Sequence, residues 1–449
     1  MVFIPIVAQP LLQAFAVAFT QPTFQRWLLL LVAALLTPGR RTVTNVLRTV
    51  HSLVVGHPSS YHRVFSYRRW SAWRLSRTLT TFILTHWVPT GPVVLVGDDT
   101  VAEHPGRRVF GKARHRDAVR SSHTFTAYRW GHKWIVVTVL VQFPFATRPW
   151  ALPVLVALYH SEEWNARHGR RHKTPPVLLR QLLAVVLHWF PHRRFFFAGD
   201  GSYGTHDLAR FAQRHHARLT LVSRFCARAN LYTPPPARGG TAKIGRPRTK
   251  GTKLPWPQTV VAAALRRRLT VRWYGGTTRQ VEVVTGTGHW YKGGQGLVAV
   301  RWVFAHDRSG THRDEYFFTT DVRLTPHQII ELYTGRWSIE TTFQELRTYL
   351  GLETTRGWTQ ATVLRAAPCL FGLFSVVALL YAWLPGDRPR LPQVHWVGKQ
   401  EVTFSDAITA VRRWVWSEWV FVMCGHKETF TQLPDAFRET LLYALAPAA

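Results

Sequence analysis

The chain has 449 residues, with 57 lysines and arginines against 24 acidic residues and a formal net charge of +33. Because self-repulsion makes so large a positive excess unfavourable in a compact protein, this charge indicates a polyanionic partner and favours nucleic acid. The hydrophobic content of 46% excludes an intrinsically disordered chain, and the length allows two or three domains with sizeable cores.

Cysteine is rare, and its three occurrences form no CxxC pair: Cys226, Cys369 and Cys424. This pattern excludes a disulfide framework and a cysteine-based zinc site, and it indicates a reducing compartment. The apolar N-terminus lacks the basic segment that begins a signal peptide, so none is predicted.

Residues 1–90 are predicted to be helical. Thr42 or Thr44 can cap a helix that follows Arg40 and Arg41, and a second basic and aromatic segment covers residues 61–70. A helix, a turn and a basic helix are typical of DNA-binding domains. The alternative is an ordinary helical bundle with a solvated basic face. Residues 27–36 are too short to span a membrane and are predicted to form a core helix.

An apolar, β-branched run at residues 93–96 predicts a buried strand that ends in two adjacent carboxylates, Asp98 and Asp99. Because strand side chains alternate, the two carboxylates should point to opposite faces, and only one can belong to a shared site. Further strands are predicted at residues 107–112, 123–128 and 133–143, followed by a helix at 175–189.

A second strand, at residues 195–197, leads into Asp200 and a glycine-rich turn, with a helix expected at 206–216 and a strand at 219–223. In open α/β sheets ligands gather at the carboxyl ends of strands, so the two acids could converge. Each aspartate taken alone is more typical of a turn or a helix cap. Four histidines in this region are predicted to be polar surface groups or phosphate contacts rather than metal ligands: His104, His115, His123 and His132.

The segment from residue 226 to 325 is predicted to start with a basic linker and to continue as a β-rich insertion. Residues 234–253 are rich in proline, glycine and basic residues, and Arg246 and Arg248 should contact phosphates, either as a minor-groove arm or as part of a flexible linker. Strands are predicted at residues 269–274, 280–285, 297–306 and 315–320. Trp273, Trp290 and Tyr291 could stack on an unpaired base, although packing in a hairpin core is the more common role of such residues.

A helix is predicted to carry Tyr333, Arg336, Glu340 and Arg347 on one face, because they are spaced at three, four and seven residues. A carboxylate that holds a metal ion beside a phosphate needs such cationic neighbours. An exposed helix with ordinary ion pairs is the alternative.

Residues 366–385 are apolar and almost long enough to span a membrane. Pro368 and Pro385 bracket this run, and the flanking charges show no clear asymmetry. We therefore expect a helix buried in the protein core and no membrane insertion.

Together these motifs resemble the DDE transposases of bacterial insertion sequences, in particular the insertion-sequence-four group. That group has a Tyr-x-x-Arg-x-x-x-Glu-x-x-x-x-x-x-Lys signature, which Tyr333, Arg336 and Glu340 match. Arg347 stands where the signature has lysine, and the two cations are not interchangeable where a phosphate is gripped.

The resemblance implies an α/β fold with an RNase H-like catalytic core and a metal-binding catalytic triad of Asp98, Asp200 and Glu340. Asp99 is the alternative to Asp98, although an Asp-x-Thr pattern with Thr100 favours Asp98. Two Mg²⁺ ions are expected, with Mn²⁺ as a substitute.

The implied organisation is a helical DNA-binding domain (1–90), the first part of the core (91–225), a basic loop and β-rich insertion (226–325), the last part of the core (326–390) and C-terminal helices (391–449). Such a protein would bind double-stranded DNA, at transposon ends and at the target, and catalyse metal-dependent cleavage and strand transfer in the bacterial cytoplasm at the nucleoid. A homodimer is one possible form of the complex with paired ends. The alternatives are an Mg²⁺-dependent RNase H-like nuclease without strand transfer and a non-catalytic basic DNA-binding protein.

Overall fold

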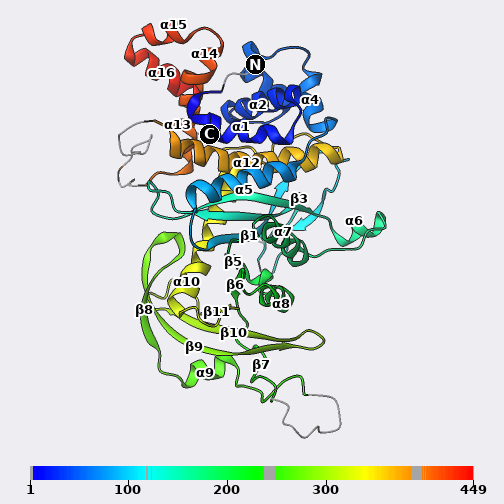
Figure 1. Ribbon diagram of the computed structural model, residues 1–449, viewed down its shortest axis with the longest axis vertical. Helices are drawn as coiled ribbons and strands as arrows, with labels where there is room; N and C mark the ends of the chain where they lie inside the picture. The colour runs from blue at the N-terminus through cyan, green and yellow to red at the C-terminus, as the bar shows by residue number, and fades with distance from the viewer. Residues whose placement is uncertain are drawn as a thin grey trace. The chain divides into compact units, whose positions relative to one another are not determined.

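The computed structural model describes residues 4–117, 120–122, 124–236, 248–385, 397, 399 and 401–447. It is a mixed α/β structure with two compact units, each built from discontinuous segments (Figure 1). Unit 1 comprises residues 1–89, 99–173 and 340–449, and unit 2 comprises residues 90–98 and 174–339. The chain crosses from unit 2 to unit 1 inside strand β1 (Val93–Glu103), between Asp98 and Asp99.

Unit 1 contains helices from both ends of the chain. The N-terminal helices are α1 (Gln9–Ala14), α2 (Gln21–Leu36), α3 (Val43–Thr49), α4 (Ser59–Ser66) and α5 (Ala72–Trp87). The later ones are α6 (Glu162–Arg167), α11 (Ser338–Thr348, from Glu340 on), α12 (Gln360–Trp383), α13 (Phe404–Val415), α14 (Phe421–Met423), α15 (Lys427–Gln432) and α16 (Asp435–Leu445). Thr42, and not Thr44, caps α3, because its side chain accepts a hydrogen bond from the Asn45 amide.

The strands of unit 1 are β2 (Ala113–Arg116), β3 (Tyr128–Val141) and β4 (Trp150–Tyr159), and β2 and β4 each pair antiparallel with a different stretch of β3. Helix α12 packs on β4 and against α5 and α13. Within the described residues, α12 is the one helix long and apolar enough to cross a membrane, and two thirds of its apolar window is buried. This burial is what the predicted core helix requires. Pro368 lies inside α12 and does not bracket it.

Unit 2 is organised around a mixed sheet in the order β1, β5, β6, β11, β10, β9, β7, with β8 paired to β9. Its strands are β5 (Phe195–Gly199), β6 (Leu219–Arg224), β7 (Leu231–Tyr232), β8 (Arg267–Arg272), β9 (Thr278–Lys292), β10 (Gly296–Asp307) and β11 (Glu315–Thr319). Its helices are α7 (Pro175–Trp189), α8 (His206–Arg214), α9 (Pro257–Ala263) and α10 (Pro326–Thr334). Strands β1, β5 and β6 are parallel, and the later pairs are antiparallel.

Helix α10 packs its apolar side on the antiparallel part of this sheet. Ile329, Ile330 and Tyr333 belong to one buried cluster with strand residues such as Val303 and Phe317. Thr325 and Gln328 form a capping box at the start of the helix, with Pro326 at its first position. The fold therefore fixes Tyr333 as a core residue of unit 2.

The four insertion strands, helix α7 and the strands around residues 195 and 219 confirm the sequence predictions. The strand predicted at 107–112 was wrong, because this stretch is irregular. The strand predicted at 123–128 was also wrong, since the described residues there are irregular until Tyr128 begins β3. Strand β1 does not end at Asp98 but continues to Glu103, and β4 was not predicted.

The segment from Tyr333 to Arg347 is not one regular α-helix, as was predicted. Helix α10 ends at Thr334, a 3₁₀ turn covers Gly335–Trp337, and α11 begins at Ser338. The backbone stays right-handed helical through Gly335 and Ser338, so the chain direction is kept while the turn tightens.

Candidate functional site

Asp98 and Asp200 follow equivalent positions of two neighbouring parallel strands. Gly97 of β1 is in register with Gly199 of β5, so each aspartate comes directly after its glycine. A Cβ atom at Gly97 would lie 2.7 Å from the Phe197 ring, and one at Gly199 would lie 2.9 Å from Tyr203. Both positions therefore need glycine. Because the two glycines are in register, Asp98 and Asp200 lie at the same level of two neighbouring strands.

Arg336 forms a salt bridge with Asp98, at 2.8 Å between Nη1 and Oδ2. The arginine side chain is buried, and the carboxylate is partly buried. Because a buried guanidinium needs an anionic partner, this contact fixes both side chains. Arg336 thus meets the first predicted acid within unit 2.

Tyr333 makes the corresponding contact with the second acid. Its hydroxyl donates a long hydrogen bond to Asp200 Oδ1, at 3.4 Å, and the side chain is fully buried. Burial raises the pKa of Tyr333 to about 12, so the phenol stays protonated and remains a donor to the carboxylate. The turn after β5 is held by Ser223, whose hydroxyl donates to the carbonyls of Gly199 and Asp200.

A second layer of polar residues supports Tyr333, and sequence reasoning missed it. The Arg224 guanidinium lies 5.9 Å from the Tyr333 ring centre and pairs with the buried Glu315. Tyr274 donates a hydrogen bond to the other oxygen of Glu315, at 2.7 Å. Burial opposes the charge of Arg224, but Tyr333 and Glu315 more than offset this, and its pKa is raised. The one sequence signal that could have indicated this layer was the position of Arg224 at the end of the strand predicted at 219–223.

Asp99 has a different partner in unit 1. Its carboxylate lies 2.9 Å from Lys133 Nζ, on β3. Strand alternation had predicted opposite orientations for Asp98 and Asp99, and their different partners agree with this.

Glu340 is the first residue of the last segment of unit 1, in the first turn of α11, and it is partly buried. Arg347, on the same helix, donates a hydrogen bond of 2.8 Å to Thr100 Oγ1, and burial lowers its pKa. Unit 2 brings Asp98 and Asp200 together with Tyr333 and Arg336. Across the described ranges, no group of three or more His, Cys, Asp or Glu side chains is arranged to hold a metal ion.

The predicted DNA-binding arginines outside the signature differ in exposure. Arg40 and Arg248 are exposed, whereas Arg246 lies outside the described residues. Arg41 is buried and donates to the carbonyls of Gly39 and Tyr349, and burial lowers its pKa to about 10. Arg41 is therefore bonded within unit 1, and its contact with a DNA phosphate stays a prediction.

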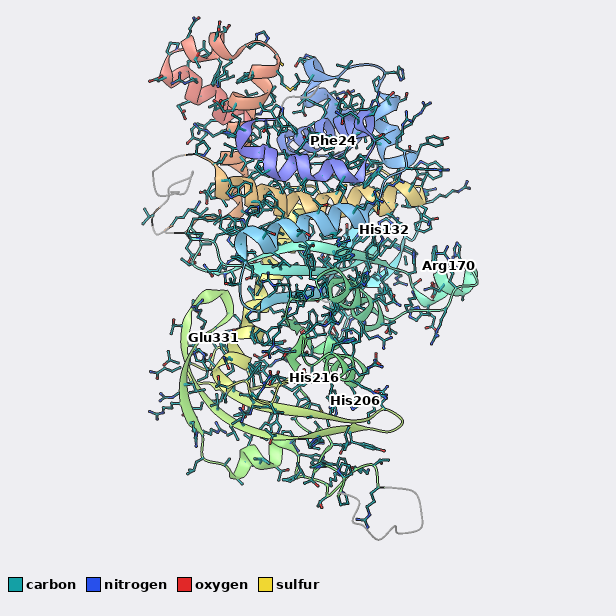
Figure 2. All side chains as sticks on the ribbon, viewed as in Figure 1. Phe24, His132, Arg170, His206, His216 and Glu331 are labelled. Carbon is teal, nitrogen blue, oxygen red and sulfur yellow. The ribbon has the colours of Figure 1, made fainter. Side chains whose placement is uncertain are left out.

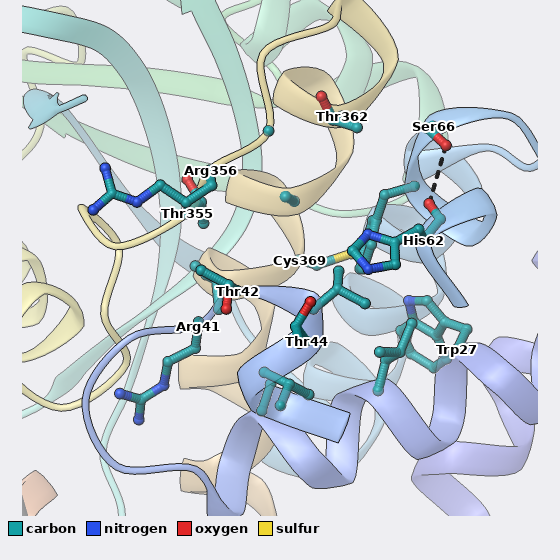
Figure 3. A pocket seen from close by; sticks show the side chains of 18 of the residues that line it. Trp27, Arg41, Thr42, Thr44, His62, Ser66, Thr355, Arg356, Thr362 and Cys369 are labelled. Carbon is teal, nitrogen blue, oxygen red and sulfur yellow. Dashed lines mark hydrogen bonds between the residues drawn. The ribbon is translucent and has the colours of Figure 1, made fainter. Parts of the chain in front are cut away.

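Arg41 also lines a cavity of about 510 Å³ in unit 1, between the N-terminal helices and the start of α12 (Figure 3). Trp27, Thr42, Arg356 and Cys369 contribute to the same lining. The three predicted catalytic acids are not part of it.

The three aromatic residues proposed for base stacking also have different environments. Trp273 is buried in the unit 2 core, so it cannot stack on a base. His206, labelled in Figure 2, begins α8. The Trp290 ring packs edge-on against the His206 ring, and the Trp290 carbonyl lies 3.1 Å from His206 Nε2. Tyr291 is partly buried, with Lys250 Nζ 4.2 Å from its ring centre.

Three of the four histidines predicted to be polar surface groups or phosphate contacts are buried, so the surface prediction was wrong for His104, His115 and His132. Burial lowers the pKa of all three, to about 4 for His104 and His115, so they are neutral near pH 7. His123 lies outside the described residues.

Comparisons with known proteins give related results for different parts of the chain. Residues 301–370 match the family described as "Archaeal putative transposase ISC1217". A solved structure of the piggyBac transposase synaptic complex with hairpin DNA is similar, at a TM-score of 0.39 and 10% identity, over 96% of this chain and 78% of that chain. No curated protein matches the sequence. Residues 14–280, more than half of the chain, match the family described as DDE superfamily endonuclease. The chain therefore belongs to the DDE superfamily of endonucleases.

Proposed function

We propose that the protein is a DDE transposase that binds the ends of an insertion sequence and catalyses metal-dependent DNA cleavage and strand transfer. The observation that carries this proposal is the pair of contacts in unit 2. Arg336 pairs with Asp98, inside β1, and Tyr333 bonds to Asp200, directly after β5, so two signature residues meet the two predicted acids. An unrelated pair of turn aspartates would have no reason to share this arrangement.

Asp98, Asp200 and Glu340 would hold the metal ions. Carboxylate oxygens are the ligands that Mg²⁺ prefers, and Asp98 and Asp200 follow strand positions that are in register. Bound Mg²⁺ ions would supply activation of the attacking hydroxyl group and stabilisation of the leaving 3′-oxygen, with Mn²⁺ as a substitute. Endonucleases of this superfamily generally use divalent metals, and the number of two ions is part of the proposal.

Each neighbouring residue has a role in this scheme. Tyr333 donates a hydrogen bond to Asp200 and orients that carboxylate, because the buried phenol stays protonated. Arg336 balances the charge of Asp98 and would turn to a DNA phosphate when the carboxylate holds metal. Arg347 would fix a further phosphate in place of the lysine of the insertion-sequence-four group. Exposed Arg40 and Arg248 would contact the DNA backbone.

An RNase H-like core is the fold that this proposal requires. Its support is the order of β1, β3 and β4, then helix α7, strand β5, helix α8 and strand β6, with β1, β5 and β6 parallel. The five sequence regions predicted above, including the helical DNA-binding domain at 1–90, belong to the same proposal. So do paired-end assembly as a homodimer and action at the nucleoid.

A purified-protein assay tests the catalytic assignment. DNA that carries the ends of the flanking genomic repeat is incubated with Mg²⁺ and wild-type protein, Asp200→Asn, Glu340→Gln or the control Asp207→Asn. Asp207 pairs with Arg180 on the outside of unit 2, so its variant should cleave like the wild type. Asp200→Asn and Glu340→Gln should bind DNA normally and not cleave it, and Mg²⁺-dependent nicking by either would refute the triad.

Pre-cleaved ends with a free 3′-hydroxyl separate the two enzymatic readings. A transposase joins these ends to a target duplex, whereas a nuclease does not. A non-catalytic DNA-binding protein would show neither reaction, and its binding would not change when all three acids are replaced.

A further inference from the structure

One face of the β2–β3 hairpin of unit 1 carries solvent-exposed aromatic and cationic side chains. Arg114 and Arg116 of β2 are in register with Trp130 and Tyr128 of β3. Residues directly opposite each other in an antiparallel pair project to the same face, so these four side chains share one surface. We call it the stacking face. Tyr128 is 50% exposed and Trp130 is 59% exposed.

One arginine of the stacking face and a neighbouring lysine lie near its rings. The Arg114 guanidinium lies 3.9 Å from the centre of the Tyr128 ring, and Lys112 Nζ lies 5.9 Å from that of Trp130. The carboxylates of this region have another partner. Asp117 and Glu103 both pair with Arg129, which points to the opposite side of β3 because it stands between the two exposed aromatics. The stacking face therefore combines positive charge with open aromatic rings.

Protection of an edge strand does not explain this surface. β2 ends the sheet path of unit 1, and arginines on such a strand can prevent edge-to-edge aggregation. Exposed tryptophan and tyrosine rings would have the opposite effect, because they add apolar area to the edge. The rings need a partner with flat faces and negative charge.

We infer that the stacking face binds unpaired DNA strands, with bases on Tyr128 and Trp130 and phosphates beside Arg114 and Arg116. This inference rests on the proposed function, since it takes DNA as the partner. Two residues along a strand separate the rings by about 7 Å, twice the roughly 3.4 Å rise of stacked bases in a duplex. Successive bases can reach both rings only if the strand is unstacked, so single-stranded DNA fits and duplex does not.

Fluorescence anisotropy in EDTA tests this inference without any cleavage. The probes are a labelled 20-nucleotide oligothymidylate and a labelled duplex of mixed sequence, each with wild-type protein, Tyr128→Ala or Trp130→Ala. Each ring lost should weaken single-strand binding about tenfold and change duplex binding less than about twofold. Trp130→Phe keeps a ring and should bind within about threefold of wild type.

Tyr443 supplies the matched control, because it is also an exposed tyrosine, at 53%, with an arginine, Arg413, 4.9 Å from its ring centre. Tyr443→Ala should leave both affinities unchanged. Equal loss for single strand and duplex, no loss for Trp130→Ala, or no single-strand binding by the wild type would each overturn the inference. A concentration-dependent dimer that Trp130→Ala dissolves would assign the face to a second copy and also overturn it.

The outcome is separate from that of the proposed catalysis. Protein that binds the single strand through Trp130 but never cleaves repeat ends supports this inference and removes the catalytic proposal. If the wild-type protein cleaves repeat ends and Trp130→Ala binds single strands like the wild type, the catalytic proposal is supported and this inference is overturned.

Discussion

The arginines that pair with carboxylates near Tyr333 in unit 2 and the arginines on the stacking face of unit 1 have opposite surroundings. Arg336 and Arg224 are mostly enclosed and neutralise Asp98 and Glu315. Arg114 and Arg116 are exposed and lie on a surface with aromatic rings. A net charge of +33 therefore does not identify the cations that meet DNA. The anionic partner and the burial of each arginine identify these cations, because a buried arginine that already pairs with a carboxylate mainly stabilises the fold.

The largest effect is expected when the neighbouring aspartates Asp98 and Asp99 are replaced one at a time. Asp98→Asn should reduce Mg²⁺-dependent cleavage by about 1000-fold or more, because it removes a metal ligand. Asp99→Asn loses the contact with Lys133 and should keep cleavage within about threefold. Initial cleavage rates on one DNA substrate measure both. If Asp99→Asn were the inactive variant, the acid that pairs with Arg336 would not be the metal ligand, and the assignment of Asp98 would be wrong.

Removal of one arginine from each region should have unequal effects on stability. Arg336→Gln should lower the free energy of unfolding by about 3 kcal/mol, since it leaves a partly buried carboxylate unpaired, and should slow cleavage about 100-fold. Arg116→Gln should change the free energy of unfolding by less than about 0.5 kcal/mol. Denaturant titration of both variants provides the measurement. Similar losses for the two would mean that burial does not separate these regions.

The smallest expected effect concerns the pH dependence of stability at Glu345, where the nearby Arg148 does not cancel the effect of burial on the pKa. Burial raises the pKa of Glu345, on α11, to about 7, although Arg148 acts in the opposite direction. A raised folded-state pKa favours folding most at low pH, and this contribution is lost as pH rises through about 7. Glu345→Gln should therefore be more stable than wild type at pH 8, by about 2 kcal/mol, with no difference near pH 4.

Chemical unfolding at both pH values checks this prediction, with Glu401→Gln as the control. Glu401 is exposed in the same unit, so its replacement should give equal shifts at both pH values. A Glu345→Gln variant that is no more stable at pH 8 than at pH 4, relative to wild type, would contradict the assigned cause.

Much of this arrangement could be predicted from local sequence. Helix α7 has the predicted bounds, and strand alternation separated Asp98 from Asp99, because each signal depends on near neighbours. Strand β4 was missed because it is almost continuously apolar and contains Pro153, so it shows no alternation. The strands predicted at 107–112 and 123–128 were wrong, since residues 107–112 and 124–127 are irregular, and local composition is a weak signal for a strand without its sheet partners.

The supporting contacts of the site could not be predicted in this way. Arg224 and Glu315 are 91 positions apart, and Arg336 and Asp98 are 238 apart. Nothing in the composition of either partner indicates the other. The signature residues were predicted as one helical face, but Tyr333 reaches Asp200 from the core of unit 2, and this follows from the packing of α10 on the sheet.

Metal-directed cleavage of the protein itself tests most directly whether Asp98, Asp200 and Glu340 share one metal centre. Fe²⁺ bound in place of Mg²⁺ generates hydroxyl radicals with ascorbate and peroxide, and these cut the backbone next to the ligands. With repeat-end DNA bound, we predict cuts next to residues 98, 200 and 340, all suppressed by excess Mg²⁺ and absent in Asp200→Asn. Cuts at only one of the three positions, or elsewhere in the chain, would contradict the account.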